Sequence, residues 1–348
     1  MSPGARCYVG GVNLIDSVAQ CHTPFVVRDH TSGRVTALNN TAECAELVAR
    51  CPLRYVLSDD LARLCADLAY SKGAGTIACA DLLHVPAEML WMEWCNAPWQ
   101  NALREYGFPL IEAGAQWVGR RGAWVRGTRD GRRGLVRAFW SATAADVLAS
   151  SVEAYFDLDT ATGEEPEPLD GKRGLARRVF DSERSEDDIL GRCFRFRYEQ
   201  SWSEYYGGAG LSSELSFALW RHAVGTIAMD IPMMLTFFLL LATRSGLPQR
   251  AQTLEHLNRR RLLGGKVPLL EHIEVTAPVL PEYRDYPRGE PLAGRRGPRL
   301  HHVRGHLVRR GSQIFWRVPH LRGSARSGTV RTRTVTWTFD RAAAGRTH

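Results

Sequence analysis

Hydrophobic residues recur at helical spacing in three parts of the chain. In residues 58–70 an apolar face repeats with the helical period behind Ser58, a favourable N-cap residue. Residues 211–243 predict one long helix, or two helices broken near Pro232, because proline removes an interior hydrogen bond. Residues 252–263 predict a short basic helix. All three segments are therefore expected to be α-helices.

The most apolar stretch, IPMMLTFFLLLA at residues 231–242, bears on the class of protein. A membrane-spanning helix needs about twenty apolar residues, and this stretch is clearly shorter. Charged side chains flank it, with Asp230 before it and Arg244 after it. We therefore expect a core helix and not a transmembrane one.

Other segments have the pattern of strands. The run LWMEW at residues 90–94 predicts a buried strand, and residues 115–140 predict a hairpin that turns at Asp130-Gly131. Residues 1–55 give weaker strand signals. From Ile273 onward the apolar residues alternate again, in IEVTAPVL, HHVRGHLV, QIFWRV and TVRTRTVTWTF. The chain therefore mixes helices and strands.

An acidic segment with two prolines, residues 157–170, has little to bury and predicts a linker or long loop. We divide the chain on either side of it into four parts. These are an N-terminal α/β region (1–160), an acidic and basic linker or loop (161–181), a helical region (182–272) and a basic β module (273–340). The expected fold class is α+β, with an N-terminal α/β region, a helical middle and a C-terminal antiparallel β module.

Charge is distributed unevenly along the chain. The net charge is +8, but residues 284–333 hold thirteen arginines against Asp285 and Glu290, a local charge of +11. Residues 334–348 add +1, which leaves −4 for residues 1–283. A near-neutral body with an arginine-rich C-terminal end favours an anionic partner.

The basic β module supplies a candidate nucleic-acid-binding surface. Arginine contacts phosphate, and aromatic rings stack on unpaired bases. The candidate residues are Arg304, Arg309, Arg310, Arg317, Arg322, Arg326, Arg331, Arg333 and Trp316. In an alternative interpretation Phe315, Trp316 and Trp337 are core residues on the inward strand face, and only the arginines face water.

The same module offers candidates for catalysis, namely His302, Arg304, His306 and His320. On one strand the first three would share a face at period two. Histidine transfers protons near neutral pH and arginine holds phosphate in a fork, which is equipment for metal-independent phosphodiester cleavage. A solvated basic face with structural histidines explains the same residues, since spacing fixes no carboxylate or second base.

Other chemistry lacks its motifs. The eight cysteines form no C-x-x-C pair and no zinc spacing, so we expect buried, reduced thiols and no metal site. Gly264-Gly265-Lys266 follows a predicted helix and is expected to end it, because a phosphate loop follows a strand. No cofactor is expected. The N-terminus has no long apolar region of the secretory type, which favours a cytosolic protein.

Several motifs occur in a characteristic order. They are LNRRR at 257–261, GKVPLLEH at 265–272, HHVRGH at 301–306, FWR at 315–317 and PHLRG at 319–323. This order resembles a group of uncharacterised accessory proteins of tailed bacteriophages and prophages, as does LWMEW at 90–94. The resemblance covers about residues 235–337. It implies a viral protein that acts in the cytoplasm of a bacterial host, and it implies no reaction.

Three functions are compatible with these observations. The first is a phage-encoded accessory protein that binds nucleic acid or a nucleoprotein complex through its C-terminal arginines. The second is a metal-independent ribonuclease or other nuclease that uses the histidines and arginines of the basic β module. The third is a protein-binding inhibitor of a host defence or transcription complex. None of the three requires a membrane, and the sequence specifies no oligomeric state.

Overall fold

The computed structural model describes residues 13–20, 25–28, 35–38, 40–70, 80–106, 119–141, 147–172, 189–208, 213–243, 246–278, 299–303, 306–317, 320–322 and 324–329. The chain forms two compact units. One comprises Met1–Pro278 with Leu307–Phe315, and the other comprises Val279–His306 with Trp316–His348.

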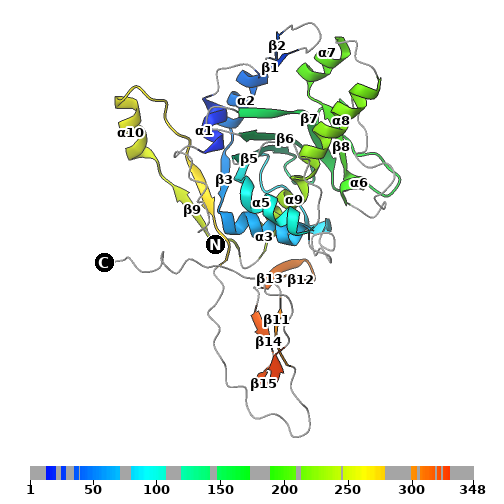
Figure 1. Cartoon of the computed structure of the whole chain (residues 1–348), viewed down its shortest axis with the longest axis vertical. Coiled ribbons are helices and arrows are strands. Elements are labelled where there is room, and N and C mark those ends of the chain that lie inside the picture. The colour runs from blue at the N-terminus through cyan, green and yellow to red at the C-terminus, as the bar shows by residue number, and fades with distance from the viewer. Residues whose placement is uncertain are drawn as a thin grey trace. The chain divides into compact units, whose positions relative to one another are not determined.

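A large, mostly antiparallel sheet runs through the first unit (Figure 1). Its eight strands lie in the order β8-β7-β6-β5-β4-β3-β10-β9. They are β3 (Leu53–Leu57), β4 (Met89–Cys95), β5 (Arg120–Gly127), β6 (Arg133–Ser141), β7 (Val147–Asp157), β8 (Phe194–Tyr198), β9 (Gln249–Gln252) and β10 (His272–Val275). Strands β10, β3 and β4 run parallel, and the other neighbours pair antiparallel. The fold is therefore a mixture of α and β structure.

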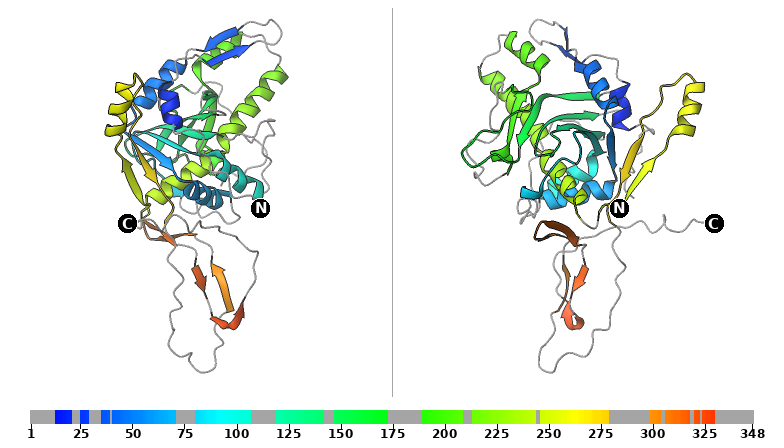
Figure 2. Two further views of the ribbon diagram at one scale, coloured as in Figure 1. Left: turned by 60° about the vertical axis from the view of Figure 1, so that its left-hand side comes forward. Right: turned by 180° about the vertical axis from the view of Figure 1, so that it is seen from behind.

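Helices cover both faces of this sheet (Figure 2). They are α1 (Leu14–Ala19), α2 (Asn40–Ala49), α3 (Asp59–Tyr70), α5 (Asn96–Glu105), α6 (Ile189–Cys193), α7 (Gln200–Gly208), α8 (Ser213–Ala228), α9 (Ile231–Leu241) and α10 (Glu255–Leu263), with the 3-10 helix η1 (Ala80–Leu82). Helix α3 packs against α5 and α9, while α1 and α2 form a second core with Trp91, Trp124 and Phe139. Strand β4 is buried on both faces because helices cover both.

Glu93 in β4 anchors helix α1 to the sheet. Its carboxylate is fully buried and accepts hydrogen bonds from the backbone N–H groups of Leu14 and Ile15, at 3.1 and 2.8 Å. The indole Nε1 of Trp91 donates to it at 3.0 Å and Nε of Arg120 at 2.6 Å. A buried charge is tolerated only with such partners, so Glu93 has a structural role.

Several local predictions are confirmed. Ser58 caps α3, since its hydroxyl accepts the N–H of Leu61 at 3.3 Å. The β5–β6 hairpin turns at Asp130-Gly131, where Gly131 has a φ of 69° that favours glycine. The long helical segment is two helices, and Pro232 lies in the first turn of α9. There a proline costs no hydrogen bond, because the first N–H groups of a helix have no partner within it.

The apolar segment has the burial of a core helix. Phe217–Leu241 is long and apolar enough to cross a membrane by length and composition alone, but 72% of its most apolar window is buried inside the protein. In α9 the side chains of Phe237, Leu239 and Leu240 are fully buried. Tyr55 of β3 meets Phe237 edge-on, with ring centroids 5.5 Å apart. Packing against the protein's own sheet accounts for this hydrophobicity.

Other elements differ from the sequence-based expectation. The region 182–272, predicted to be helical, contains β8 and β9 as well as helices. Strand β10, predicted to open the C-terminal module, belongs to the large sheet beside β3. Residues 1–55, which gave weak strand signals, contain the antiparallel strands β1 (Phe25–Arg28) and β2 (Val35–Leu38) but also the unpredicted α1 and α2. These strands are only four or five residues long, too short to establish a period in the sequence.

The acidic segment 157–170 is a loop held by ion pairs. The pairs are Asp159–Arg132 at 2.6 Å, Glu165–Arg195 at 2.6 Å, Glu167–Arg133 at 3.1 Å and Asp170–Arg197 at 2.7 Å. Pro166 and Pro168 are buried. The segment is a long loop, as the sequence predicted, and its acids pair with arginines of β6, β8 and the β5–β6 turn.

The C-terminal strands form two small sheets. In one, β11 (Arg299–Val303) lies between β14 (His320–Arg322) and β15 (Ser324–Thr329). It pairs antiparallel with β14 and parallel with β15. In the other, β12 (His306–Arg310) pairs with β13 (Gln313–Arg317), and most of this hairpin belongs to the first compact unit.

Candidate nucleic-acid interface

The β12–β13 hairpin presents three of the predicted arginines to solvent. Arg309, Arg310 and Arg317 are exposed, whereas Ile314 and Trp316 are 4% and 8% exposed. Buried and more exposed side chains alternate along β13, as the strand pattern in the sequence predicted. The hairpin therefore buries Ile314 and Trp316 of β13 and exposes basic side chains from both of its strands.

The exposed arginines differ in their surroundings. Nη1 of Arg309 donates to Asp81 Oδ1 at 2.7 Å, and its Nε donates to the carbonyl of Gly311 at 2.9 Å. Both side chains of this ion pair are about half exposed, so the pair contributes little and exchanges easily for another anion. The guanidinium of Arg310 lies over the ring of Phe315 at 5.8 Å. Stacking of this kind leaves the N–H groups of a guanidinium available to phosphate.

A second basic surface lies on α10, which sequence analysis predicted as a helix but did not include in the candidate interface. None of its residues is buried. Arg259 and Arg260 are exposed on it, and Lys266 is exposed in the loop that follows. The signal in the sequence was the RRR run within a helix that has no apolar period. Such a helix has little to bury in its own protein.

The remaining predicted arginines lie in the smaller sheet or outside the described residues. Arg322 is in β14 and Arg326 is in β15. Arg304, Arg331 and Arg333 lie outside the described residues, as does Trp337. Their part in a nucleic-acid surface stays a prediction.

The predicted catalytic residues do not share one strand. His302 is in β11 and His306 begins β12, and these strands belong to different sheets. The expectation that they share a face at period two is therefore wrong, because alternation in a sequence does not reveal where a strand ends. In the β11–β14 register His302 lies opposite Leu321, and His320 lies opposite Val303. The pairing sets neither histidine directly across from the other.

Trp316 is almost completely buried, with 8% of its surface exposed. This placement fits the alternative interpretation of the aromatic residues, in which the ring packs inward while arginines face water. A buried indole has no free face on which a base can stack. The surface that we consider for nucleic acid therefore does not include Trp316.

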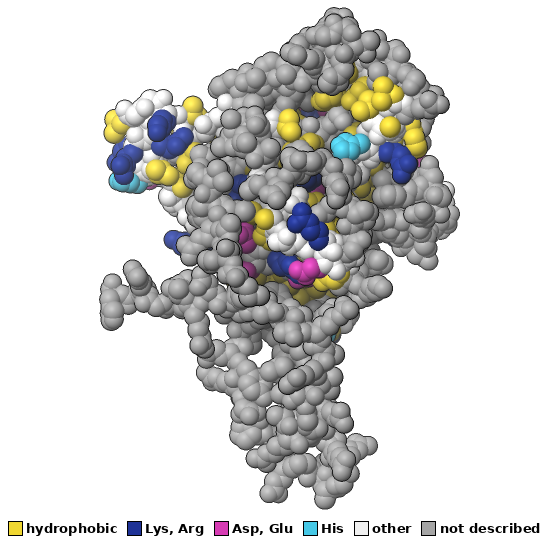
Figure 3. All heavy atoms as spheres, viewed as in Figure 1, with side chains coloured by type: hydrophobic (Ala, Val, Ile, Leu, Met, Phe, Trp, Pro, Cys, Tyr) yellow, Lys and Arg dark blue, Asp and Glu magenta, His cyan; other side chains and the backbone are white. Residues whose placement is uncertain are grey.

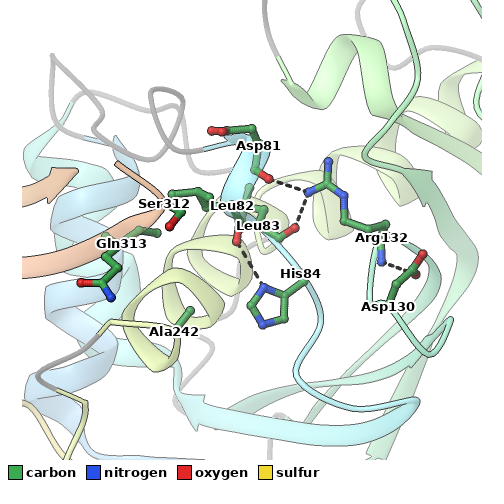
Figure 4. A pocket seen from close by; sticks show the side chains of 10 residues that line it. Asp81, Leu82, Leu83, His84, Asp130, Arg132, Ala242, Ser312 and Gln313 are labelled. Atoms are coloured by element: carbon green, nitrogen blue, oxygen red, sulfur yellow. Dashed lines mark hydrogen bonds between the residues drawn. The ribbon is translucent and has the colours of Figure 1, made fainter. Parts of the chain in front are cut away.

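A polar hollow of about 460 Å³ lies beside the turn of the β12–β13 hairpin (Figure 4). Its lining residues are Asp81, Leu82, Leu83, His84, Asp130, Arg132, Ala242, Ser312, Gln313 and Ile314. They come from η1, the β5–β6 turn, the end of α9 and the hairpin turn. The hollow brings together an imidazole, two carboxylates and a guanidinium, so we considered it as a reaction site.

The charged groups of the hollow are engaged in holding loops. Arg132 donates to both Asp159 and the carbonyl of Leu158, at 2.6 and 3.2 Å. The pKa of Asp130 is lowered because the Thr128 hydroxyl and the backbone N–H of Arg132 donate to its carboxylate. Nδ1 of His84 lies 3.2 Å from the carbonyl of Leu82, two positions earlier in the chain. The arrangement therefore braces the β5–β6 turn and does not pair an acid with a base.

No protein-family model, curated protein or solved structure matches this chain. The likeness to bacteriophage and prophage proteins rests on the sequence motifs alone.

Buried ion pairs elsewhere connect elements of the fold. Arg121 of β5 donates to Asp230, at the break between α8 and α9, at 2.7 Å. The rings of Trp99 and Trp140 lie 4.9 and 5.7 Å from the same guanidinium. Burial raises the pKa of Asp230, against the opposing effect of Arg121. The pair joins the sheet to the helical layer, because neither charge can be buried without the other.

The cysteines in the described part of the chain behave as core residues. Cys44, Cys51, Cys65, Cys95 and Cys193 are buried free thiols. Burial raises the pKa of Cys44 and of Cys51 to about 12, so both are protonated at neutral pH. In the part of the chain that the structure describes, no group of three His, Cys, Asp or Glu side chains is placed to hold a metal ion.

Proposed function

We propose that this protein binds nucleic acid through arginines of its basic β module, residues 273–340. The observation that carries the proposal is the exposure of Arg309, Arg310 and Arg317 on a single hairpin whose other side chains include the buried Ile314 and Trp316. A single guanidinium can bind one small anion through two parallel hydrogen bonds. Guanidinium groups on two adjacent strands are better suited to the successive phosphates of a nucleic acid. The local charge of +11 over residues 284–333 supports the same partner.

The biological setting that we propose follows from the sequence motifs. Their order resembles accessory proteins of tailed bacteriophages and prophages, so the protein would act in the cytoplasm of a bacterial host. Its target there would be nucleic acid or a host nucleoprotein complex. Phosphate contacts supply affinity without reading sequence, which suits a protein that meets nucleic acid of any sequence.

The test is fluorescence anisotropy of labelled DNA and RNA, single-stranded and duplex, over a range of salt. Each bound phosphate releases counterion, so binding should weaken steeply as salt rises. Replacement of Arg309, Arg310 and Arg317 by Ala should weaken binding and reduce the salt slope by about one for each phosphate that is no longer bound. Arg50 directly follows α2, Arg104 lies on α5 and Arg126 lies on β5, and all three are exposed. Their replacement by Ala removes the same charge and should have a smaller effect.

Three outcomes would contradict nucleic-acid binding by the hairpin arginines. No binding tighter than tens of micromolar at low salt would refute the proposal, because non-specific binding alone reaches about that affinity. Equal losses of affinity in the two triple variants would show that only total charge matters. Recovery of the labelled strand intact in EDTA distinguishes binding from metal-independent cleavage. Cleavage in EDTA that His306→Ala abolishes would favour the nuclease instead.

A further inference from the structure

Strands β9 and β10 carry α10 at the edge of the large sheet, and we call residues 249–275 the α10 arm. Figures 1 and 2 show α10 at the outer end of this arm, away from the helices that cover the sheet. In the described part of the chain seven large hydrophobic side chains are exposed, and four of them lie on the arm. They are Leu257, Leu262, Leu263 and Val267, with 44%, 60%, 85% and 51% of their surface exposed.

The arm has a fixed shape despite this exposure. The Asn258 side chain both donates to and accepts from the backbone of Leu269, at 2.9 and 2.7 Å. Nε of Arg261 donates to the carbonyl of Val267 at 2.9 Å. Gly265 turns the chain with a φ of 67°, and the N–H of Leu270 donates to Asp16 at 2.7 Å. The motif LNxxR…GKxPL thus closes the loop on the helix, and a preorganised element loses little entropy when it binds.

The side chains that the bracing does not use are basic or apolar. Arg259, Arg260 and Lys266 are exposed beside Leu262 and Leu263. Figure 3 shows these two kinds of side chain next to each other on the arm, at the upper left of the view. Arg259 lies 3.2 Å from Glu255, in a highly exposed pair of little energetic weight. The outer end of the α10 arm therefore exposes both cationic and apolar side chains to solvent.

The arrangement of these groups narrows the choice of partner. Arg259, Arg260 and Arg261 are consecutive, so they point about 100° apart around the helix axis. Leu262 and Leu263 diverge by the same angle. No apolar stripe exists on α10 that could lie on a membrane surface or in the groove of another protein, since both need one continuous face. The exposed apolar side chains therefore lie among cations and form no continuous face.

We infer that the α10 arm binds duplex DNA, with Arg259, Arg260 and Lys266 on the phosphates and Leu263 inserted with Val267 as an apolar wedge between base pairs. Protruding apolar side chains among basic ones are the means by which proteins unstack and bend a duplex. The inference rests on the proposed nucleic-acid binding and specifies its substrate as duplex DNA that is bent on binding. It uses a surface different from the β12–β13 hairpin, so the two can be tested separately.

The experiment uses the full chain and a duplex of about 30 base pairs with a donor and an acceptor dye on its two ends. Anisotropy reports binding, and energy transfer reports bending. The wild type should bring the ends closer together. Leu263→Ala with Val267→Ala should abolish the energy-transfer change while affinity falls less than about tenfold. Arg259→Ala with Arg260→Ala should weaken binding about tenfold or more and lower the salt slope by about two.

Matched controls are available on the same protein. Leu215→Ala with Phe217→Ala changes two exposed apolar residues of α8 and should alter neither signal. Arg104→Ala with Arg126→Ala removes the same charge as the arm variant and should leave bending intact. All these side chains are exposed, so each variant should keep the thermal unfolding midpoint of the wild type.

Each contrary result has its own meaning. If the arm variants bind and bend DNA like the wild type while the hairpin variant binds weakly, the arm inference is wrong and the proposed function stands. If the wild type binds no nucleic acid, both are wrong. Binding without an energy-transfer change refutes the wedge. Binding to phosphatidylglycerol vesicles that depends on Leu263, with DNA binding unaffected, would assign the arm to a membrane surface instead.

Discussion

The side chain of Asn258 and the backbone of Leu269 form two reciprocal hydrogen bonds, at 2.9 and 2.7 Å, across eleven positions of sequence. One amide side chain thereby satisfies both polar groups of Leu269 and holds the loop after α10 against the helix. The pairing gives a structural reason for the asparagine of the LNxxR motif. Because these hydrogen bonds lie within the protein, the structure of the arm can be tested without a ligand.

Asn258→Ala should loosen the loop without unfolding the protein. The substitution removes both hydrogen bonds with Leu269, and each such bond is worth about 0.5–1.5 kcal/mol. Backbone amides of residues 264–270 should exchange hydrogen faster, while the core of α9 should not change. Hydrogen exchange followed by mass spectrometry measures both. Unchanged exchange in the loop would show that other interactions fix it.

Leu239→Asp should destabilise the whole first unit. Leu239 is fully buried in α9, where a carboxylate would lie among apolar side chains without a hydrogen-bond or ion-pair partner. An unpaired buried charge costs several kcal/mol, or about the entire stability of many proteins. Poor soluble expression or a large fall in the unfolding midpoint is expected. Leu215→Asp, at an exposed position of α8, serves as the control. An unchanged midpoint for Leu239→Asp would mean that α9 is not core.

The five buried thiols should resist alkylation in the native protein. Cys44 and Cys51 are buried, and their pKa values of about 12 leave about one thiolate in ten thousand at pH 8. Iodoacetamide followed by peptide mapping should modify Cys44, Cys51, Cys65, Cys95 and Cys193 only after denaturation. Rapid native labelling of Cys44 or Cys51 would contradict the packing of α2 against the sheet.

Asp170 should contribute stability in a pH-dependent manner. Both terminal nitrogens of Arg197 donate to its carboxylate, at 2.8 and 2.7 Å, and these bonds lower the pKa of Asp170. An acid with a lowered folded-state pKa stabilises the fold above its ordinary pKa of about 4. That contribution is lost as pH falls through the lowered value.

Asp170→Asn should therefore lower the unfolding midpoint at neutral pH, and the difference from the wild type should shrink toward about pH 2. Thermal unfolding at a series of pH values measures this difference. Glu164→Gln, in the same loop at an exposed position, provides the control. A difference that grows as the solution becomes acidic would have the wrong sign for the Asp170–Arg197 pair.

Local patterns in the sequence were reliable where one segment contains all the relevant information. The Ser58 hydroxyl and the N–H that it caps are three residues apart, and the hairpin turn depends on the adjacent Asp130 and Gly131. The apolar run of α9 and the strand at 90–94 follow from continuous hydrophobicity, since only a covered element tolerates it. The excess of arginine at the C-terminal end is likewise a property of composition.

The candidate interface shows where such inference stops. Burial alternates along β13 as the sequence predicted, but the separation of His302 from His306 into different sheets is a matter of strand pairing. The acidic loop could be predicted as a loop but not its ion pairs, because its partners Arg195 and Arg197 lie more than twenty residues further along the chain. The sequence contains the acid and the arginine of each ion pair, but it does not show that folding brings them together.

By itself, then, the sequence determined a mixed α and β protein with an apolar core helix and an arginine-rich end, because period, capping and composition act over a few neighbouring residues. The tertiary structure decided that β10 pairs with β3 and that α10 stands at the end of an arm. It also decided that Asn258 holds Leu269. These features depend on interactions between distant segments, whose free energy comes from burial and pairing that arise only when the chain is folded.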